Sequence, residues 1–242
     1  MVNTETIRFI VGVIGNVISF FLFASPIPTF WKIIKKGDVE EFSPMPYLAA
    51  SMNCVLWVFY GMPFVHPHST LVWTINGTGL FLELCYLSTY LRFSNNQQRM
   101  KVFKIFAVEV ALFAIIAATA LLGFHTYTSR SMVVGIVCVI FGVCMYASPL
   151  TIVRLVIKTR SVKYMPFFLS LASFLNGIIW VIYALLRFDP YILTGNGLGT
   201  LFGAIQLIVY AYYYFFGSNE SKEEAELEMS NSRVQPPSRD VA

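Results

Sequence analysis

Long apolar runs separated by short polar segments dominate the pattern of this chain. A helix rises about 1.5 Å per residue, so about 20 consecutive apolar residues cross a bilayer. Seven runs of this order predict seven transmembrane helices, at residues 7–31, 45–63, 70–92, 102–123, 131–154, 166–186 and 191–216. Prolines and glycines inside several runs are compatible with spans, because neighbouring helices satisfy the backbone groups that they free.

Composition supports a membrane protein. Hydrophobic residues make up 57% of the 242 residues and charged residues only 12%, whereas soluble domains carry about 25% charged residues. The apolar surplus must face lipid, because a domain of this length has too much surface for so few charges. The net charge of +4 does not indicate nucleic-acid binding, since the basic residues lie in short loops without interleaved aromatics.

The basic residues predict the orientation. Seven crossings place the termini on opposite sides, and Lys and Arg concentrate on the cytoplasmic side. Arg8, Arg130 and Arg187 flank one end of the runs. Eleven basic residues flank the other end: Lys32, Lys35, Lys36, Arg92, Arg99, Lys101, Lys104, Arg154, Lys158, Arg160 and Lys163. We expect an outer N-terminus, a plasma-membrane rather than vacuolar location, and a disordered cytoplasmic tail at 217–242, which is polar and charged.

The first run is a helix rather than a signal peptide, because it is too long and lacks a basic start and a small-residue cleavage site. The four cysteines fall inside apolar runs at spacings that fit neither a zinc site nor a disulfide framework, so we expect small core residues. No catalytic triad, metal-ligand set or phosphate loop is present, and His66, His68 and His125 fall in outer loops. The sequence thus predicts no enzyme activity, no cofactor and no metal.

Four segments recur in the same order later in the chain. The offset is 120 or 123 residues, which differ by a three-residue indel. The pairs are 24–27 (ASPI) with 147–150 (ASPL), 43–47 (SPMPY) with 163–167 (KYMPF), 53–60 (NCVLWVFY) with 176–183 (NGIIWVIY), and 76–79 (NGTG) with 196–199 (NGLG). Runs one to three therefore repeat as runs five to seven, and the fourth run is a linker that lets both copies keep one orientation.

The repeat predicts an all-α membrane fold of two parallel three-helix bundles joined by a linker helix. The first bundle covers 1–92, the linker helix with its loops 93–129, and the second bundle 130–216. In transporters built from repeats, the substrate site lies near the bilayer midplane where the repeats meet.

Two amides and two indoles recur at matched depth. Asn76 and Asn196 each lie about six residues from the outer ends of their runs, ~10 Å deep, and Trp57 and Trp180 lie ~16 to 21 Å from the inner ends. An amide both donates to and accepts from a hydroxyl without the desolvation cost of an ion, and an indole covers the apolar face of a pyranose. This constellation favours a sugar site, although a single such Asn or Trp serves as readily in helix packing.

The ASP motif near the end of the first run, MYASPLTIVRLVIKTRSVKYMPFFLSL at 145–171, the NGTG and NGLG pair and the three-plus-one-plus-three plan resemble the plant and animal SWEET sugar transporters over residues 7–216. SWEETs are an established example of parallel repeats, so this agreement is no independent test. The resemblance implies that Asn76, Asn196, Trp57 and Trp180 line the sugar site. Asn53 and Asn176 would lie one helical turn from the tryptophans, where some relatives carry Ser or Cys.

The resemblance also implies how the pocket selects its sugar. Leu22 and Met145 would face the pocket, with Ser19 and Gly142 as its other wall, each pair 123 residues apart. Larger side chains at the first pair accompany monosaccharides in this family, so we expect glucose-like hexoses, with sucrose as the alternative.

Four prolines at matched inner depth, Pro26, Pro46, Pro149 and Pro166, predict hinges for alternating access, and the resemblance implies a proline tetrad there. Pro46 and Pro166 also suit a first helical turn. On the outer side, a hydrogen bond from Tyr60 to Asp189 would close the mouth, and the resemblance supports it. An interfacial Tyr is more often a membrane anchor, and a loop Asp is more often solvated.

Glu83 and Glu109 are the acids within the predicted spans, and neither has a repeat mate. Glu83 suits an interhelical hydrogen bond better than a proton relay, so we expect a uniporter driven by the sugar gradient. The predicted partners are a mono- or disaccharide and the bilayer, with a homo-oligomer as an open alternative. The alternative of a seven-helix receptor is disfavoured, because the chain lacks the sequence motifs of such receptors. The alternative of an amino-acid exporter is disfavoured, because it would need charged partners in the pocket.

Overall fold

The computed structural model describes residues 3–217, and within this range every regular element is helical. The tail predicted to be disordered lies, after Gly217, outside the described residues. The α-helices are α1 Thr4–Ala24, α2 Ile27–Lys36, α3 Met45–Gly61, α4 Thr70–Phe93, α5 Asn96–Gly123, α6 Tyr127–Met145, α7 Ala147–Thr159, α8 Phe167–Leu186 and α9 Pro190–Phe216. A short 3-10 helix, η1 Val162–Tyr164, precedes α8.

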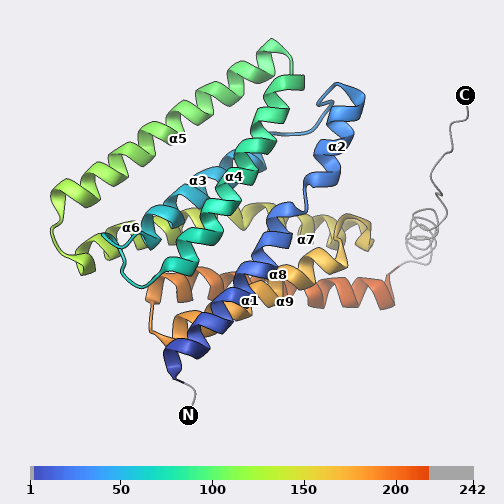
Figure 1. The fold of residues 1–242 in the computed structure, drawn as a ribbon. Coiled ribbons are helices and arrows are strands. Elements are labelled where there is room, and N and C mark those ends of the chain that lie inside the picture. Colours follow the sequence, from blue (N-terminus) through green and yellow to red (C-terminus); the bar gives the residue numbers. More distant parts are fainter. Residues whose placement is uncertain (1–2, 218–242) are drawn as a thin grey trace, which may run out of the picture.

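The nine helices make seven crossings of the bundle, because α1 with α2 and α6 with α7 are each one crossing interrupted near a proline. We call the end at which α1 begins the N-face; it also holds the loops 62–69, 124–126 and 187–189. The opposite end is the C-face, with the loops 37–44, 94–95 and 160–166 (Figure 1). The prediction of seven helices in a three-plus-one-plus-three arrangement is confirmed.

Both breaks follow from proline chemistry. A proline has no N–H to donate, and its ring clashes with the carbonyl four residues earlier. In the first crossing Pro26 is the N-cap of α2, and α1 ends at Ala24. In the fifth crossing Pro149 is the third residue of α7, so the break falls at Tyr146, just after Met145, whose carbonyl the ring opposes.

Several predicted boundaries were too short. The first crossing reaches from Thr4 to Lys36, the fourth begins at Asn96, and the fifth reaches from Tyr127 to Thr159. Polar residues continue these helices beyond the apolar runs; Asn95, for example, caps α5 through a reciprocal bond with Gln98. Among the described residues, five helical stretches are long and apolar enough to span a membrane by themselves, and α3 and α4 are not among them. Both are inner helices of the first half, where neighbours rather than lipid cover much of their surface.

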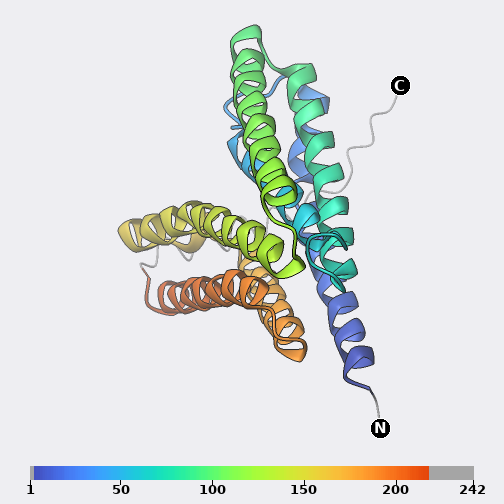
Figure 2. The ribbon, with the colours of Figure 1, turned by 90° about the vertical axis from the view of Figure 1, so that its left-hand side faces the viewer.

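Each half has the same internal order. The central helix is α4 in the first half, between α1–α2 and α3, and α9 in the second half, between α6–α7 and α8. The halves meet through two pairs, α1 with α8 and α3 with α6, and α5 packs on α3 and α6 as the linker. Figure 2 shows the two halves diverging from this junction, with the first half upright and the second leaning to the left.

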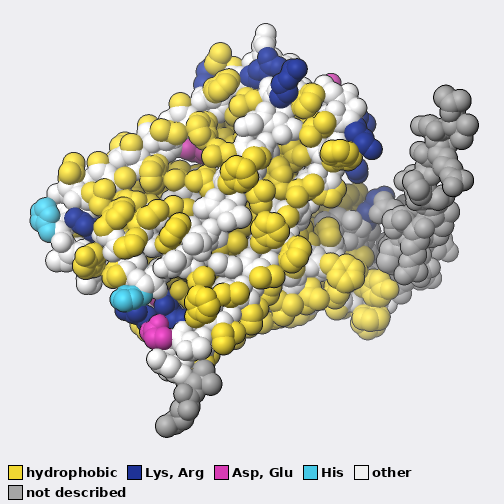
Figure 3. All heavy atoms as spheres, in the orientation of Figure 1, with side chains coloured by type: hydrophobic (Ala, Val, Ile, Leu, Met, Phe, Trp, Pro, Cys, Tyr) yellow, Lys and Arg dark blue, Asp and Glu magenta, His cyan; other side chains and the backbone are white. Residues whose placement is uncertain are grey.

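The surface agrees with a bilayer environment. Large apolar side chains such as Phe81, Leu122 and Phe168 are exposed on the outside of the bundle. Figure 3 shows hydrophobic side chains over most of the visible face, with Lys and Arg gathered at the C-face. The expectation that all four cysteines are core residues was half wrong. Cys54 and Cys138 are buried, whereas Cys85 and Cys144 are exposed, and all four are free thiols.

Candidate functional site

A central cavity of about 330 Å³ lies between the two halves. Its lining contains every residue predicted to bind or select a sugar: Asn76, Asn196, Trp57, Trp180, Asn53, Asn176, Ser19, Leu22, Gly142 and Met145. They come from α1, α3 and α4 of the first half and α6, α8 and α9 of the second. No charged side chain of residues 3–217 is part of this lining. Their roles in binding stay predictions, but the fold brings all ten to one place.

The two amides expected at the centre of the site have the same geometry. Asn76 Nδ2 donates to the carbonyl of Val72 at 2.8 Å, and Asn196 Nδ2 donates to the carbonyl of Ile192 at 2.9 Å. Each bond runs to the residue four positions earlier in the same helix and leaves one N–H and the amide oxygen for another partner. The helix thus fixes both amides with matching polar groups available to a ligand in the cavity.

Ser19 ties the indole and an amide of the second half to α1. Its hydroxyl donates to Asn176 Oδ1 at 2.7 Å and accepts from Trp180 Nε1 at 3.2 Å. The close approach depends on Gly15, because a Cβ at that position would lie 3.1 Å from the Trp180 ring. Trp180 is consequently only 6% exposed.

The position equivalent to Ser19 in the second half carries no side chain. Gly142 stands where the repeat of Ser19 would be, and a Cβ built there would meet no atom within 4 Å. Asn53, the repeat of Asn176, has a buried Oδ1 atom without a hydrogen-bond partner among the described residues. A buried amide oxygen without a partner costs about 1–3 kcal/mol. The repeat of the Ser19–Asn176 bond is therefore missing on this side, where Gly142 leaves open space and the Asn53 oxygen is buried without a partner among the described residues.

A second cavity of about 360 Å³, the C-face cavity, continues from the central one. Leu22, Tyr146, Asn176 and Asn196 line both cavities. Of the four predicted hinge prolines, Pro149 and Pro166 line the C-face cavity, whereas Pro26 and Pro46 do not. Tyr146 stands at the junction, with its hydroxyl bonded to the carbonyl of Gly195 at 2.7 Å.

The N-face side of the central cavity is closed by bonds between the halves. The Tyr60 hydroxyl lies 2.9 and 3.0 Å from the two oxygens of Asp189, so the bond predicted from sequence is present. Both residues are almost fully buried, Tyr60 at 0% and Asp189 at 1% exposure. Asp189 also caps α9 by accepting from the backbone N–H groups of Tyr191 and Ile192. The alternatives of a membrane anchor and a solvated loop residue are therefore wrong for this pair.

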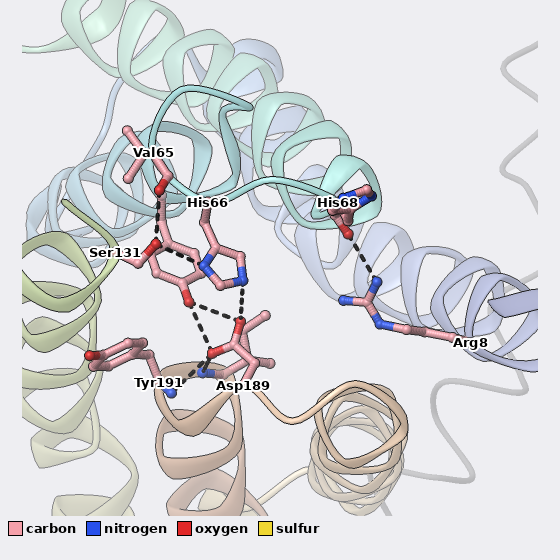
Figure 4. A network of polar contacts seen from close by, with 9 residues as sticks. Arg8, Val65, His66, His68, Ser131, Asp189 and Tyr191 are labelled. Atoms are coloured by element: carbon pink, nitrogen blue, oxygen red, sulfur yellow. Dashed lines mark hydrogen bonds and ion pairs between the residues drawn. The ribbon is translucent and has the colours of Figure 1, made fainter. Parts of the chain in front are cut away.

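His66 and Ser131 complete this N-face network, which we define as Tyr60, Val65, His66, Ser131 and Asp189. Figure 4 labels Val65, His66, Ser131 and Asp189. His66 Nε2 lies 3.2 Å from Asp189 Oδ2, and its Nδ1 lies 2.9 Å from Ser131 Oγ. The Ser131 hydroxyl also lies 2.8 Å from the carbonyl of Val65. Sequence reasoning missed His66 and Ser131, because a loop histidine and a single serine carry no pattern of their own.

Acidification is expected to weaken the N-face network. Burial lowers the pKa of His66 below its ordinary 6.5 although Asp189 opposes this, and Arg187, Arg8 and His68 lower it further. The unfolded chain therefore binds a proton more readily, so stability from neutral His66 is lost as pH falls below 6.5. We expect the wild-type melting temperature to fall more than that of His66→Gln between pH 7.5 and pH 5.5, as thermal unfolding in detergent would measure. Equal pH responses of the two proteins would contradict this reading.

Glu83 departs from its predicted role. It is buried in α4 at 4% exposure, and its Oε2 atom has no hydrogen-bond partner among the described residues. The interhelical hydrogen bond expected for this carboxyl group is thus missing at that atom. Its repeat position in α9 is Gly203, which lines the C-face cavity, whereas Glu83 lines neither cavity.

Comparisons with known proteins agree with this geometry. The chain matches the family model described as a sugar efflux transporter for intercellular exchange at residues 9–98 and 132–215. It is 52% identical over 236 residues to the bidirectional sugar transporter SWEET5 of Arabidopsis thaliana, covering 97% of this chain and 98% of the relative. It is 55% identical over 245 residues to SWEET4 of the same plant, with the same coverage.

A solved structure of a eukaryotic SWEET transporter superposes with a TM-score of 0.83 at 36% identity, covering 87% of this chain and 98% of that one. The two matched segments of the family model coincide with the two halves of the fold and leave α5 between them. These matches exclude the alternatives of a receptor, an amino-acid exporter and an enzyme. The chain belongs to the SWEET family of membrane sugar transporters.

Proposed function

We propose that this protein is a facilitative, bidirectional uniporter for hexoses that works by alternating access around the central cavity. The named relatives are bidirectional sugar transporters. Transport by this chain would carry a sugar down its own gradient, in either direction, past Asn76 and Asn196.

The observation that carries the proposal is the pattern of available polar atoms in an uncharged cavity. Asn76 and Asn196 each use one N–H within their own helix and keep the other N–H and the amide oxygen for a ligand, and the space in front of Gly142 is open. A sugar placed there would bond to both amides through its hydroxyls. A volume of about 330 Å³ lies within the roughly 300–1,000 Å³ of small-ligand pockets, which is enough room for a monosaccharide.

Alternating access is supported by the closure of one end and the cavity at the other. Bonds between the halves seal the N-face, and the C-face cavity continues from the central one. The helix breaks near Pro26 and Pro149 would let the C-face parts α2 and α7 move relative to α1 and α6. The halves 1–92 and 130–216 would then rock about the central cavity, joined by 93–129.

Uniport is supported by the absence of acids from the route. Neither cavity is lined by an acidic residue of the described chain. A proton-coupled carrier normally has such a residue facing its substrate path.

Sugar flux into proteoliposomes tests the proposal. We expect saturable glucose uptake and efflux that follow the glucose gradient, with weaker sucrose flux and no change when pH gradient and membrane potential are collapsed. Dominant sucrose flux would support the sucrose alternative. A requirement for a pH gradient would overturn uniport, and flux of neither sugar would overturn the proposal as a whole.

Gly142→Ser is expected to weaken glucose transport. The added side chain would occupy the open space in front of Gly142, which a sugar would otherwise fill. A fit that is weaker by about 1 kcal/mol corresponds to a severalfold loss of affinity. Initial rates of glucose uptake against concentration measure this as a raised KM. Gly123→Ser serves as a control, because a Cβ there also meets nothing within 4 Å but lies at the end of α5, outside the cavity.

We further propose that the C-face is cytoplasmic, because eleven of the fourteen basic residues in the helices and loops flank that end. Antibody access to a tag before Thr4 on intact cells would test it, since staining without permeabilisation requires an outer N-face. Plasma-membrane rather than vacuolar location and a homo-oligomeric state are proposals that fluorescence microscopy and size measurement of the purified protein would test.

A further inference from the structure

A second contact between the halves lies on the N-face, on the side opposite to the Tyr60–Asp189 pair. Arg8 of α1 places its guanidinium carbon 4.0 Å from the centre of the Tyr183 ring of α8. Its Nη1 donates to the carbonyl of His68 at 2.9 Å (Figure 4). Arg8 is only 5% exposed. The cation therefore joins the first turns of α1 and the loop 62–69 to the second half.

The internal repeat relates this contact to the N-face network. Arg8 is the repeat of Ser131, and Tyr183 is the repeat of Tyr60, because both pairs are 123 residues apart. The position of Arg8 and Ser131 and the position of Tyr60 and Tyr183 thus each bridge the halves twice, once on each side of the N-face. On one side the tyrosine bonds to Asp189, and on the other it lies under Arg8.

A third repeated position explains why Tyr60 bonds to a carboxylate whereas Tyr183 contacts a cation. Asp189 is the N-cap of α9, and its repeat 120 residues earlier is Ser69, the N-cap of α4. Ser69 is buried and its hydroxyl has no partner among the described residues, so the N-cap on this side offers Tyr183 a hydroxyl in place of a carboxylate. Arg8 contacts the face of the Tyr183 ring instead.

Arg8 is not held as a permanent structural ion pair would be. Its Nε atom is buried without a hydrogen-bond partner among the described residues. Within the described chain, the guanidinium thus contacts one carbonyl, that of His68, and the face of the Tyr183 ring. Burying a charge with incomplete compensation is costly, so hydration of the cation offsets part of the free energy that is lost when the contact breaks.

We propose that Arg8 and Tyr183 form a second closure of the N-face, which must separate together with Tyr60 and Asp189 when the carrier opens to that side. Arg8 acts as a positioning residue: it touches no sugar and sets the balance between the two orientations of the carrier. This inference rests on the alternating-access function proposed above.

The native thiol of Cys138 reports this balance. Cys138 lines the central cavity and is fully buried while the N-face is closed. A charged, membrane-impermeant methanethiosulfonate applied from the N-face reaches it only when that face opens. Labelling is measured by mass spectrometry in oriented proteoliposomes, separately from each side, and Cys138→Ser identifies the signal.

Arg8→Gln is expected to raise the rate of Cys138 labelling from the N-face by on the order of tenfold, because a desolvated cation–π contact is worth roughly 2 kcal/mol. Labelling from the C-face should not rise with it, because the thiol is fully buried while the N-face is closed, whereas simple loosening of the fold would raise labelling from both faces. Arg8→Lys keeps the cation and should give an intermediate rate. Tyr183→Phe keeps the ring and should label as wild type, whereas Tyr183→Leu should label as Arg8→Gln.

The matched control is Arg187→Gln, since Arg187 also lies on the N-face but is exposed, and its contact with Glu5 is a 4.0 Å ion pair between two exposed side chains. It should label as wild type. Wild-type labelling of Arg8→Gln from the N-face would overturn the proposal, as would equal increases from both faces. If Arg8→Gln does not fold, the comparison of Tyr183→Phe with Tyr183→Leu decides the question. Labelling of Cys138 needs no sugar. A wild-type protein that transports no glucose would therefore defeat the proposed function, while the labelling rates of the Arg8 and Tyr183 variants would still decide the closure proposal separately.

Discussion

Asn76→Ala and Asn196→Ala are each expected to reduce glucose flux by about one to two orders of magnitude while the protein stays folded. Each change removes an amide oxygen and an N–H from the central cavity, and a sugar hydroxyl that loses its partner there costs about 1–3 kcal/mol. Each 1.4 kcal/mol corresponds to about tenfold in affinity. The helices should persist, since each lost Nδ2 bond runs only to a carbonyl of the same helix.

Initial rates of labelled glucose uptake into proteoliposomes, normalised to the amount of protein, measure this effect. Thr78→Ala and Thr194→Ala are the matched controls. Each threonine lies two residues from its asparagine in the same helix and bonds to the carbonyl four positions earlier, but both are exposed. We expect both control variants to transport as wild type. Unchanged flux in Asn76→Ala and Asn196→Ala would remove the central cavity from the transport route.

Asp189→Ala is expected to destabilise the protein and abolish most transport. The carboxylate caps α9 and accepts a hydrogen bond from the buried Tyr60 hydroxyl. Loss of an N-cap costs about 0.5–2 kcal/mol, and an orphaned buried hydroxyl about 1–3 kcal/mol. A total of roughly 2–5 kcal/mol would lower the melting temperature in detergent, and a carrier that cannot close its N-face cannot complete its cycle.

Two milder variants separate the cap from the closure. Asp189→Asn keeps a good N-cap residue and an acceptor for Tyr60, so most of the thermal stability should return. Tyr60→Phe keeps the cap and removes the bond between the halves, so it should lower flux with a smaller loss of stability. If Asp189→Ala melted and transported as wild type, the N-face network would have no part in either property.

The sequence alone predicted the membrane class, the seven crossings and the repeat. These features depend on local and additive properties: about 20 apolar residues cross a bilayer wherever they occur, and repeated segments fold alike. The residues lining the cavity were also predictable, because the repeat and the family resemblance pointed to the same positions. Helix ends were less so, since polar caps such as Asn95 extend helices past the apolar runs.

Only the tertiary structure decided how the two halves differ. Ser19 bonds to Asn176, but its repeat Gly142 leaves Asn53 unpartnered, and this asymmetry exists only once α3 lies against α6. Likewise Arg8, His66 and Ser131 acquire a role because residues 60 to 175 positions apart in the chain meet at one face. Hydrophobic periodicity fixes which residues enter the membrane. Which polar atoms find a partner there depends on contacts between helices, and a linear pattern does not encode those distances.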